Sequence, residues 1–194
     1  MALSSKEVKK LFDYARKSIG LTFKRKKFVP KKVPESLRVK RGVFVTLETY
    51  PDKSLRGCIG FIEPVTLFQG VIDAARSSAF NDPRFPMLNE KELDHVIVEI
   101  SILTPAKEIK FIDSRELLDK ISKGDGLILE KGYNKGLFLP QVWDKVPDKK
   151  RFLDELCLKA GLPYGAWISP EVRVYKFKVK AWVENKPKGS IKRV

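Results

Sequence analysis

The chain contains few of the residues that metal centres and disulfide frameworks require. It has two cysteines, Cys58 and Cys157, and one histidine, His95, among 194 residues. A single histidine argues against a histidine-based metal cage and against a Ser-His-Asp triad. We therefore predict two free thiols, no metal site and no cofactor.

Long apolar runs are also absent. No stretch of about 18 consecutive apolar residues occurs, which excludes a transmembrane helix. The first residues lead directly into an amphipathic pattern without the apolar centre of a signal peptide. With the scarcity of cysteine, these features predict a cytoplasmic protein that has no membrane partner.

Positive charge, in contrast, is abundant. The net charge is +15, and residues 24–41 contain nine basic residues and one acid. Such a segment can hold RNA or another polyanion by releasing counterions. The alternative is a lysine-rich surface that only keeps the protein soluble, because no base-stacking motif accompanies the charge.

Hydrophobic periodicity and turn signals predict helices interspersed with strands. Two pairs of strands are separated by short turns, which favours an α+β fold with mainly antiparallel sheets and flanking helices. The predicted helices span residues 4–20, 66–80, 113–121 and 148–160. The predicted strands span residues 42–49, 55–62, 96–103, 126–130, 136–142 and 172–183.

The second predicted strand carries an unusual motif, Leu-Arg-Gly-Cys-Ile-Gly at residues 55–60. Gly57 and Gly60 suggest a bulge or a close backbone approach, because glycine weakens a strand interior. Alternation along a strand would place Arg56, Cys58 and Gly60 on one face. A cation beside a thiol on a face kept open by glycine is typical of a reactive or ligand-binding site.

Each of these side chains has two interpretations. Cys58 is either a nucleophile favoured by the neighbouring Arg56 or a small buried hydrophobe. Arg56, which cannot lose its charge, either pairs with Glu99 inside the sheet or clamps an anion. In the second case Glu99 would orient Arg56 or act as a base.

A rigid polar loop follows the second helix, at Asn-Asp-Pro-Arg-Phe, residues 81–85. Asp82 and Arg84 in this loop form either a structural turn with an internal ion pair or the rim of the same site. Cys157, in contrast, lies on an apolar helical face and is predicted to pack in a core.

With these motifs in place, the chain resembles the AMMECR family. The resemblance rests on residues 55–60 and 81–85, on Glu-Ile-Ser-Ile-Leu-Thr-Pro at 99–105, on Gly-Leu-Phe-Leu-Pro-Gln-Val at 136–142, and on Lys-Ala-Gly-Leu at 159–162. It implies one AMMECR-type domain over residues 4–194, built as two interleaved lobes with a cleft near the first motif. It also implies a role in RNA or nucleotide metabolism, or Memo-like or radical-SAM protein partners.

Three functions are compatible with these features. In the first, a cleft around the 55–60 motif binds an anionic ligand, such as a nucleotide, RNA or a carboxylated metabolite. Its ligand-binding residues would be Arg56, Gly57, Gly60, Asp82 and Arg84. In the second, an enzyme uses the Cys58 thiol while Glu99 or Asp82 handles protons. In the third, the protein is a scaffold and the motif is purely structural.

Overall fold

The computed structural model describes residues 3–194, which divide into two compact units. The first unit combines the chain up to Leu103 with Lys180–Val194, and the second comprises Thr104–Val179. The first unit is therefore discontinuous, because the chain leaves it after one strand and returns in another.

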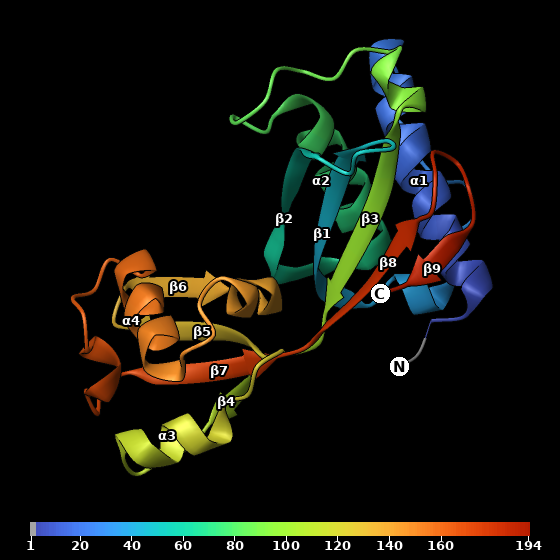
Figure 1. Cartoon of the computed structure of the whole chain (residues 1–194). Coiled ribbons are helices and arrows are strands. Elements are labelled where there is room, and N and C mark those ends of the chain that lie inside the picture. Colours follow the sequence, from blue (N-terminus) through green and yellow to red (C-terminus); the bar gives the residue numbers. More distant parts are fainter. Residues whose placement is uncertain (1–2) are drawn as a thin grey trace. The chain divides into compact units, whose positions relative to one another are not determined.

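The first unit contains a five-stranded sheet in the order β2-β1-β3-β8-β9 (Figure 1). Its paired neighbours β1–β2, β1–β3 and β8–β9 run antiparallel. The strands are β1 (Lys40–Thr49), β2 (Leu55–Thr66), β3 (Val96–Leu103), β8 (Val179–Glu184) and β9 (Ile191–Arg193). The helices are α1 (Ser5–Phe23), α2 (Leu67–Phe80) and two 3-10 turns, Glu35–Leu37 and Glu92–Asp94.

One face of this sheet packs against both helices. Alternate β1 residues Val43, Val45 and Leu47 are fully buried in a core shared with α1 and α2. A capping box begins α1, because the Ser4 side chain accepts from the Glu7 N–H and the Glu7 side chain accepts from the Ser4 N–H. The helix continues three residues beyond its predicted end at Gly20.

Strand β2 is longer than predicted. The predicted strand ends at Ile62, but β2 continues through Pro64 to Thr66. β2 is the edge strand of its sheet, and an edge position tolerates a residue without an N–H group.

The second unit contains a four-stranded antiparallel sheet in the order β4-β7-β5-β6. The strands are β4 (Lys107–Ile109), β5 (Gly126–Lys131), β6 (Asn134–Phe138) and β7 (Arg173–Phe177). The helices are α3 (Ser114–Lys120), α4 (Lys149–Lys159) and the 3-10 turns Pro140–Asp144 and Ala166–Ile168. Phe152 of α4 stacks on Trp143 with ring centroids 3.7 Å apart, and Cys157 is fully buried in the same core.

The last predicted strand is in fact two strands. The strand is interrupted at Lys178. The Lys178 carbonyl accepts from the Thr104 N–H, and the Lys178 N–H donates to Thr104 Oγ1. β7 before the break and β8 after it belong to different sheets. The prediction was wrong because an apolar and β-branched run does not reveal where a strand changes sheet.

The α+β class with antiparallel sheets and flanking helices is confirmed. Across residues 3–194, no helix combines the length and the apolar character needed to cross a membrane.

Candidate functional site

The 55–60 motif lies on edge strand β2, where a bulge changes the predicted alternation. Leu47 of β1 is opposite Gly57, but Glu48 is opposite Leu55, so Arg56 is the extra residue. A bulge re-aims side chains. Arg56 consequently has different partners from Cys58, although the strand period would place them together.

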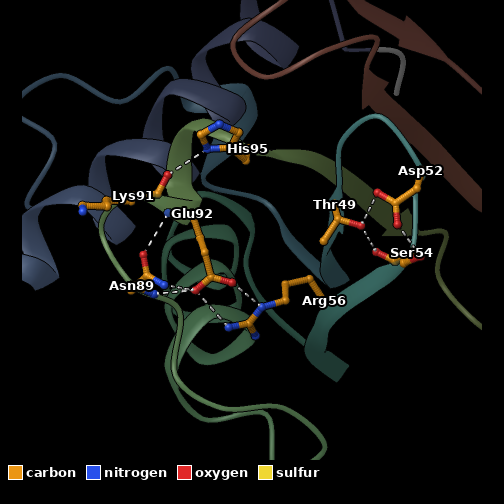
Figure 2. Close-up of polar contacts among 8 residues, drawn as sticks. All are labelled: Thr49, Asp52, Ser54, Arg56, Asn89, Lys91, Glu92 and His95. Atoms are coloured by element: carbon orange, nitrogen blue, oxygen red, sulfur yellow. Dashed lines mark hydrogen bonds and ion pairs between the residues drawn. The ribbon is translucent and has the colours of Figure 1, made fainter.

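Arg56 is held by Glu92, and the sequence had suggested Glu99. Its Nε and Nη2 donate to the Glu92 carboxylate at 3.0 and 3.3 Å, and Glu92 also accepts from the Asn89 backbone and side chain (Figure 2). The Arg56 hydrogen bond lowers the pKa of Glu92. Arg56 is buried, and its Nη1 has no hydrogen-bond partner within residues 3–194. The pair therefore joins β2 to the 3-10 turn at residues 92–94.

Gly57 permits helix α2 to approach the strand. A Cβ at this position would lie 2.1 Å from the Ser78 carbonyl oxygen. The buried Ser78 hydroxyl accepts from the Ile59 N–H at 2.8 Å and donates to the Val45 carbonyl at 2.7 Å. A helix side chain thus bridges β1 and β2, which explains the glycine without a ligand.

Gly60 has a second structural role. A Cβ there would lie 2.4 Å from Cγ of Phe44, its partner on β1. The aromatic ring occupies the space that the glycine leaves. The expected ligand-binding roles of Gly57 and Gly60 receive no support from this geometry.

Asp82 and Arg84 form a clamp on the Cys58 backbone. The buried Asp82 carboxylate accepts from the Cys58 N–H at 2.8 Å and from Arg84 Nε and Nη2 at 3.0 and 2.7 Å. Arg84 Nη2 also donates to the Cys58 carbonyl at 3.2 Å. The predicted internal ion pair is therefore present, and it also contacts the motif.

The electrostatics of the clamp follow from these contacts. The Arg84 hydrogen bond holds the pKa of Asp82 far below its usual range, against the opposing effect of burial. The hydrogen bond to Asp82 raises the pKa of Arg84, and the charge of Asp82 adds to this shift. The Arg84 side chain remains 53% exposed.

The Cys58 side chain belongs to a polar row across three strands. Thr46 of β1 is opposite Cys58 of β2 on one side and Glu99 of β3 on the other. Thr46 Oγ1 donates to Cys58 Sγ at 3.3 Å. Burial raises the pKa of Glu99, which is only partly offset by a hydrogen bond from Ser101.

These side chains do not suggest a metal centre. Within residues 3–194, no group of three or more His, Cys, Asp or Glu side chains could hold a metal ion. Of the residues singled out in the sequence, Asp82 and Arg84 contact the Cys58 backbone, and Glu99 lies across Thr46 from Cys58. The sequence-based predictions missed Ser78 as a strand bridge, Thr46 as the thiol partner and Glu92 as the Arg56 partner. Only Thr46 had a usable signal, its place in the hairpin register opposite Cys58.

The comparisons identify the family. A family model described as AMMECR1 matches residues 12–182. The chain belongs to the AMMECR1 family. Protein MJ0810 of Methanocaldococcus jannaschii is 45% identical over 185 residues, covering 92% of this chain and 90% of that protein. Protein MK0488 of Methanopyrus kandleri is 41% identical, with 98% and 94% covered.

A solved structure in the AMMECR1 family agrees with the fold. The crystal structure of the uncharacterised protein PH0010 from Pyrococcus horikoshii superposes with a TM-score of 0.87 at 42% identity. The match covers 99% of this chain and 98% of that one. The family and the α+β architecture are therefore shown.

Proposed function

We propose that this AMMECR1-family protein binds a small anionic ligand beside Cys58, with Arg84 as the group that holds the anion. The supporting observation is that Arg84 is fixed in place and yet half exposed. This proposal moves the anion-binding role from Arg56 to Arg84, because Arg56 is buried and paired with Glu92.

The guanidinium geometry favours a carboxylate or a phosphate. Asp82 and the Cys58 carbonyl use Nε and Nη2 of Arg84, which leaves the two N–H groups of Nη1 for a ligand. A guanidinium held rigidly loses little entropy when it binds, and its planar fork matches both anions. A nucleotide, an RNA phosphate or a carboxylated metabolite each offers such a group.

Titration with pyrophosphate and citrate tests this proposal. We expect Arg84→Gln to weaken binding by about tenfold or more, because it removes a charge-assisted hydrogen bond. Arg151→Gln is the control, since Arg151 lies in the second unit, is 68% exposed and pairs with Glu155. Calorimetry would measure both affinities, and equal effects of the two substitutions would contradict a specific site at Arg84.

The polar row supports a second candidate, thiol chemistry at Cys58. A hydroxyl that donates to sulfur stabilises the thiolate, which is the nucleophilic form. Glu99, across Thr46, keeps its proton to a higher pH than an exposed glutamate. Glu99 would then serve as the proton donor or acceptor for a reaction at Cys58 Sγ.

The rate of iodoacetamide alkylation tests this second candidate. We expect Cys58 to react faster than the fully buried Cys157, which is the internal control. Thr46→Val should slow the reaction of Cys58 several-fold, whereas Thr46→Ser should retain it because the hydroxyl remains. A rate that is the same in all three proteins would show that the Thr46 contact has no chemical role.

A further inference from the structure

Basic side chains gather along an extended segment between α1 and β1. Lys24, Arg25, Lys26, Lys27, Lys31 and Lys32 are all exposed. None of these six side chains forms an ion pair or a hydrogen bond with residues 3–194. We propose that residues 24–41, here called the basic segment, bind duplex nucleic acid through its phosphate backbone. This proposal does not depend on the site at Arg84.

The basic segment is fixed to the protein, although it has little regular structure. Phe28 and Val33 pack against the core of the first unit, and the Phe28 ring lies 5.6 Å from the Tyr14 ring. The Tyr14 hydroxyl donates to the Lys32 carbonyl at 3.1 Å. The lysines are thus presented from an anchored backbone, which lowers the entropy cost of binding.

These contacts also show the path of the basic segment. It leaves the end of α1 at Phe23, passes Tyr14 in the middle, and reaches Glu7 in the first turn, which accepts from the Ser36 hydroxyl. Phe23 and Glu7 are sixteen positions apart in the helix, which corresponds to about 24 Å along the axis. A duplex carries one phosphate charge per ~1.7 Å of axis, so a track of this length faces many phosphates.

Several lysines of the second unit are instead compensated by carboxylates. In the second unit, Lys110, Lys120, Lys131, Lys135 and Lys178 each pair with a nearby carboxylate. The basic segment contains one acid, Glu35, and that acid pairs with Arg38. The positive charge of the basic segment is therefore left largely uncompensated, which favours a polyanionic partner.

The side chains favour a duplex over a single strand or a membrane. Single strands are bound by stacking bases on aromatic rings, and the aromatic side chain of the segment, Phe28, packs on Tyr14. Stable insertion into a membrane surface adds an exposed apolar face to the charge, but the apolar face of α1 is buried in the core. Val29 is an isolated exposed apolar residue in the segment. The basic segment is therefore suited to contacts with phosphates and not to the recognition of bases. A duplex presents phosphates at the highest density.

Fluorescence anisotropy with 20-base-pair DNA and RNA duplexes tests the proposal on the whole chain. We expect log K to fall linearly with log salt concentration. The triple variant Lys24→Gln/Lys26→Gln/Lys27→Gln should bind on the order of 100-fold more weakly, and its salt slope should fall by about one unit per lysine. These side chains are exposed and unpaired, so the variant should keep the thermal stability of the parent protein.

The matched control removes the same charge from the second unit. Lys123, Lys145 and Lys150 are also exposed and have no partner within residues 3–194. Their replacement by Gln should leave duplex affinity nearly unchanged. Equal weakening in both triple variants would overturn the proposal, because net charge alone would then explain the binding.

Two further measurements identify which phosphate-bearing ligand binds the basic segment. Similar affinity for DNA and RNA duplexes supports backbone contact, and a preference for RNA supports additional contact with the 2′-hydroxyl groups. Vesicles containing phosphatidylserine are the competing polyanion. If vesicles bind through the basic segment and duplexes do not, the surface is a membrane contact and the proposal fails.

Discussion

The two cysteines lie in surroundings of opposite character. Cys157 is fully buried in an apolar core with Phe152, and burial raises the pKa of its thiol. Cys58 is half-buried on an edge strand, where side chains of another element bond its backbone N–H and carbonyl. Non-directional packing therefore holds one region, whereas directional hydrogen bonds hold the other. Around Cys58, replacing a single hydrogen-bonding atom therefore removes a specific contact.

Gly57→Ala should break the motif strand most severely. Its methyl group would lie 2.1 Å from the Ser78 carbonyl oxygen, so α2 and β2 must separate. We expect a loss of about 3 kcal/mol of unfolding free energy, as for an overpacked core. Gly20→Ala in α1 is the control, because its methyl group would meet only Leu93 at 3.8 Å. The control should gain about 0.5–1 kcal/mol through helix propensity. Urea denaturation measures the free energy of unfolding of both variants, which should change in opposite directions. If Gly57→Ala leaves that free energy unchanged, α2 is free to move away from β2.

Cysteine-to-serine substitutions test the difference between the two cysteines, with an expected effect on stability that is smaller than that of Gly57→Ala. Cys157→Ser places a hydroxyl in an apolar core and should cost about 2 kcal/mol. Cys58→Ser should change stability by about 0.5 kcal/mol or less, because Thr46 can hydrogen-bond a hydroxyl as well as a thiol. Thermal unfolding of the two variants gives the difference. Equal losses would mean that Cys58 is also a packing residue.

The pH dependence of stability gives the most specific effect. Because the folded pKa of Asp82 is lowered, its contribution is present above the unfolded value of about 3.9 and is lost as the pH falls through the folded value. Asp82→Asn should therefore reduce stability at pH 7 and flatten the loss of stability below about pH 4. Denaturation midpoints between pH 2 and 7 measure this slope.

Glu99→Gln should change stability at neutral pH in the opposite direction from Asp82→Asn. The folded pKa of Glu99 is raised, so its contribution is present below the unfolded pKa and is lost as the pH rises through the folded value. The substitution should thus increase stability at neutral pH. An acid slope unchanged by Asp82→Asn would contradict the role of the clamp.

Local signals predicted most of the elements. Helices α1 and α3 begin at the predicted positions, where the side-chain oxygens of Ser4 and Asp113 each accept from an N–H within the first turn. The Pro51-Asp52 turn separates the hairpin strands that carry the motif. These features depend on neighbours within a few residues, which the sequence displays directly.

The partners of the motif could not be predicted in the same way. The bulge opposite Leu47 and Glu48 makes Arg56 an extra residue of β2, and the 3-10 turn before β3 supplies Glu92 as its partner in place of Glu99. Ser78 reached β1 and β2 from a helix. Each contact joins residues that are separated along the chain, so it depends on how elements pack.

The sequence by itself determined the family, the α+β class, the position of the motif strand and the basic character of residues 24–41. Periodicity, caps and charge are local properties, so a single chain reveals them. Only the tertiary structure decided that Glu92 holds Arg56, and that Asp82 and Arg84 hold the Cys58 backbone. It also decided that the lysines of residues 24–34 have no side-chain partner among residues 3–194. The physical reason is that an ion pair or a hydrogen bond is fixed by distance in space, which is set only when strands, helices and loops are packed together.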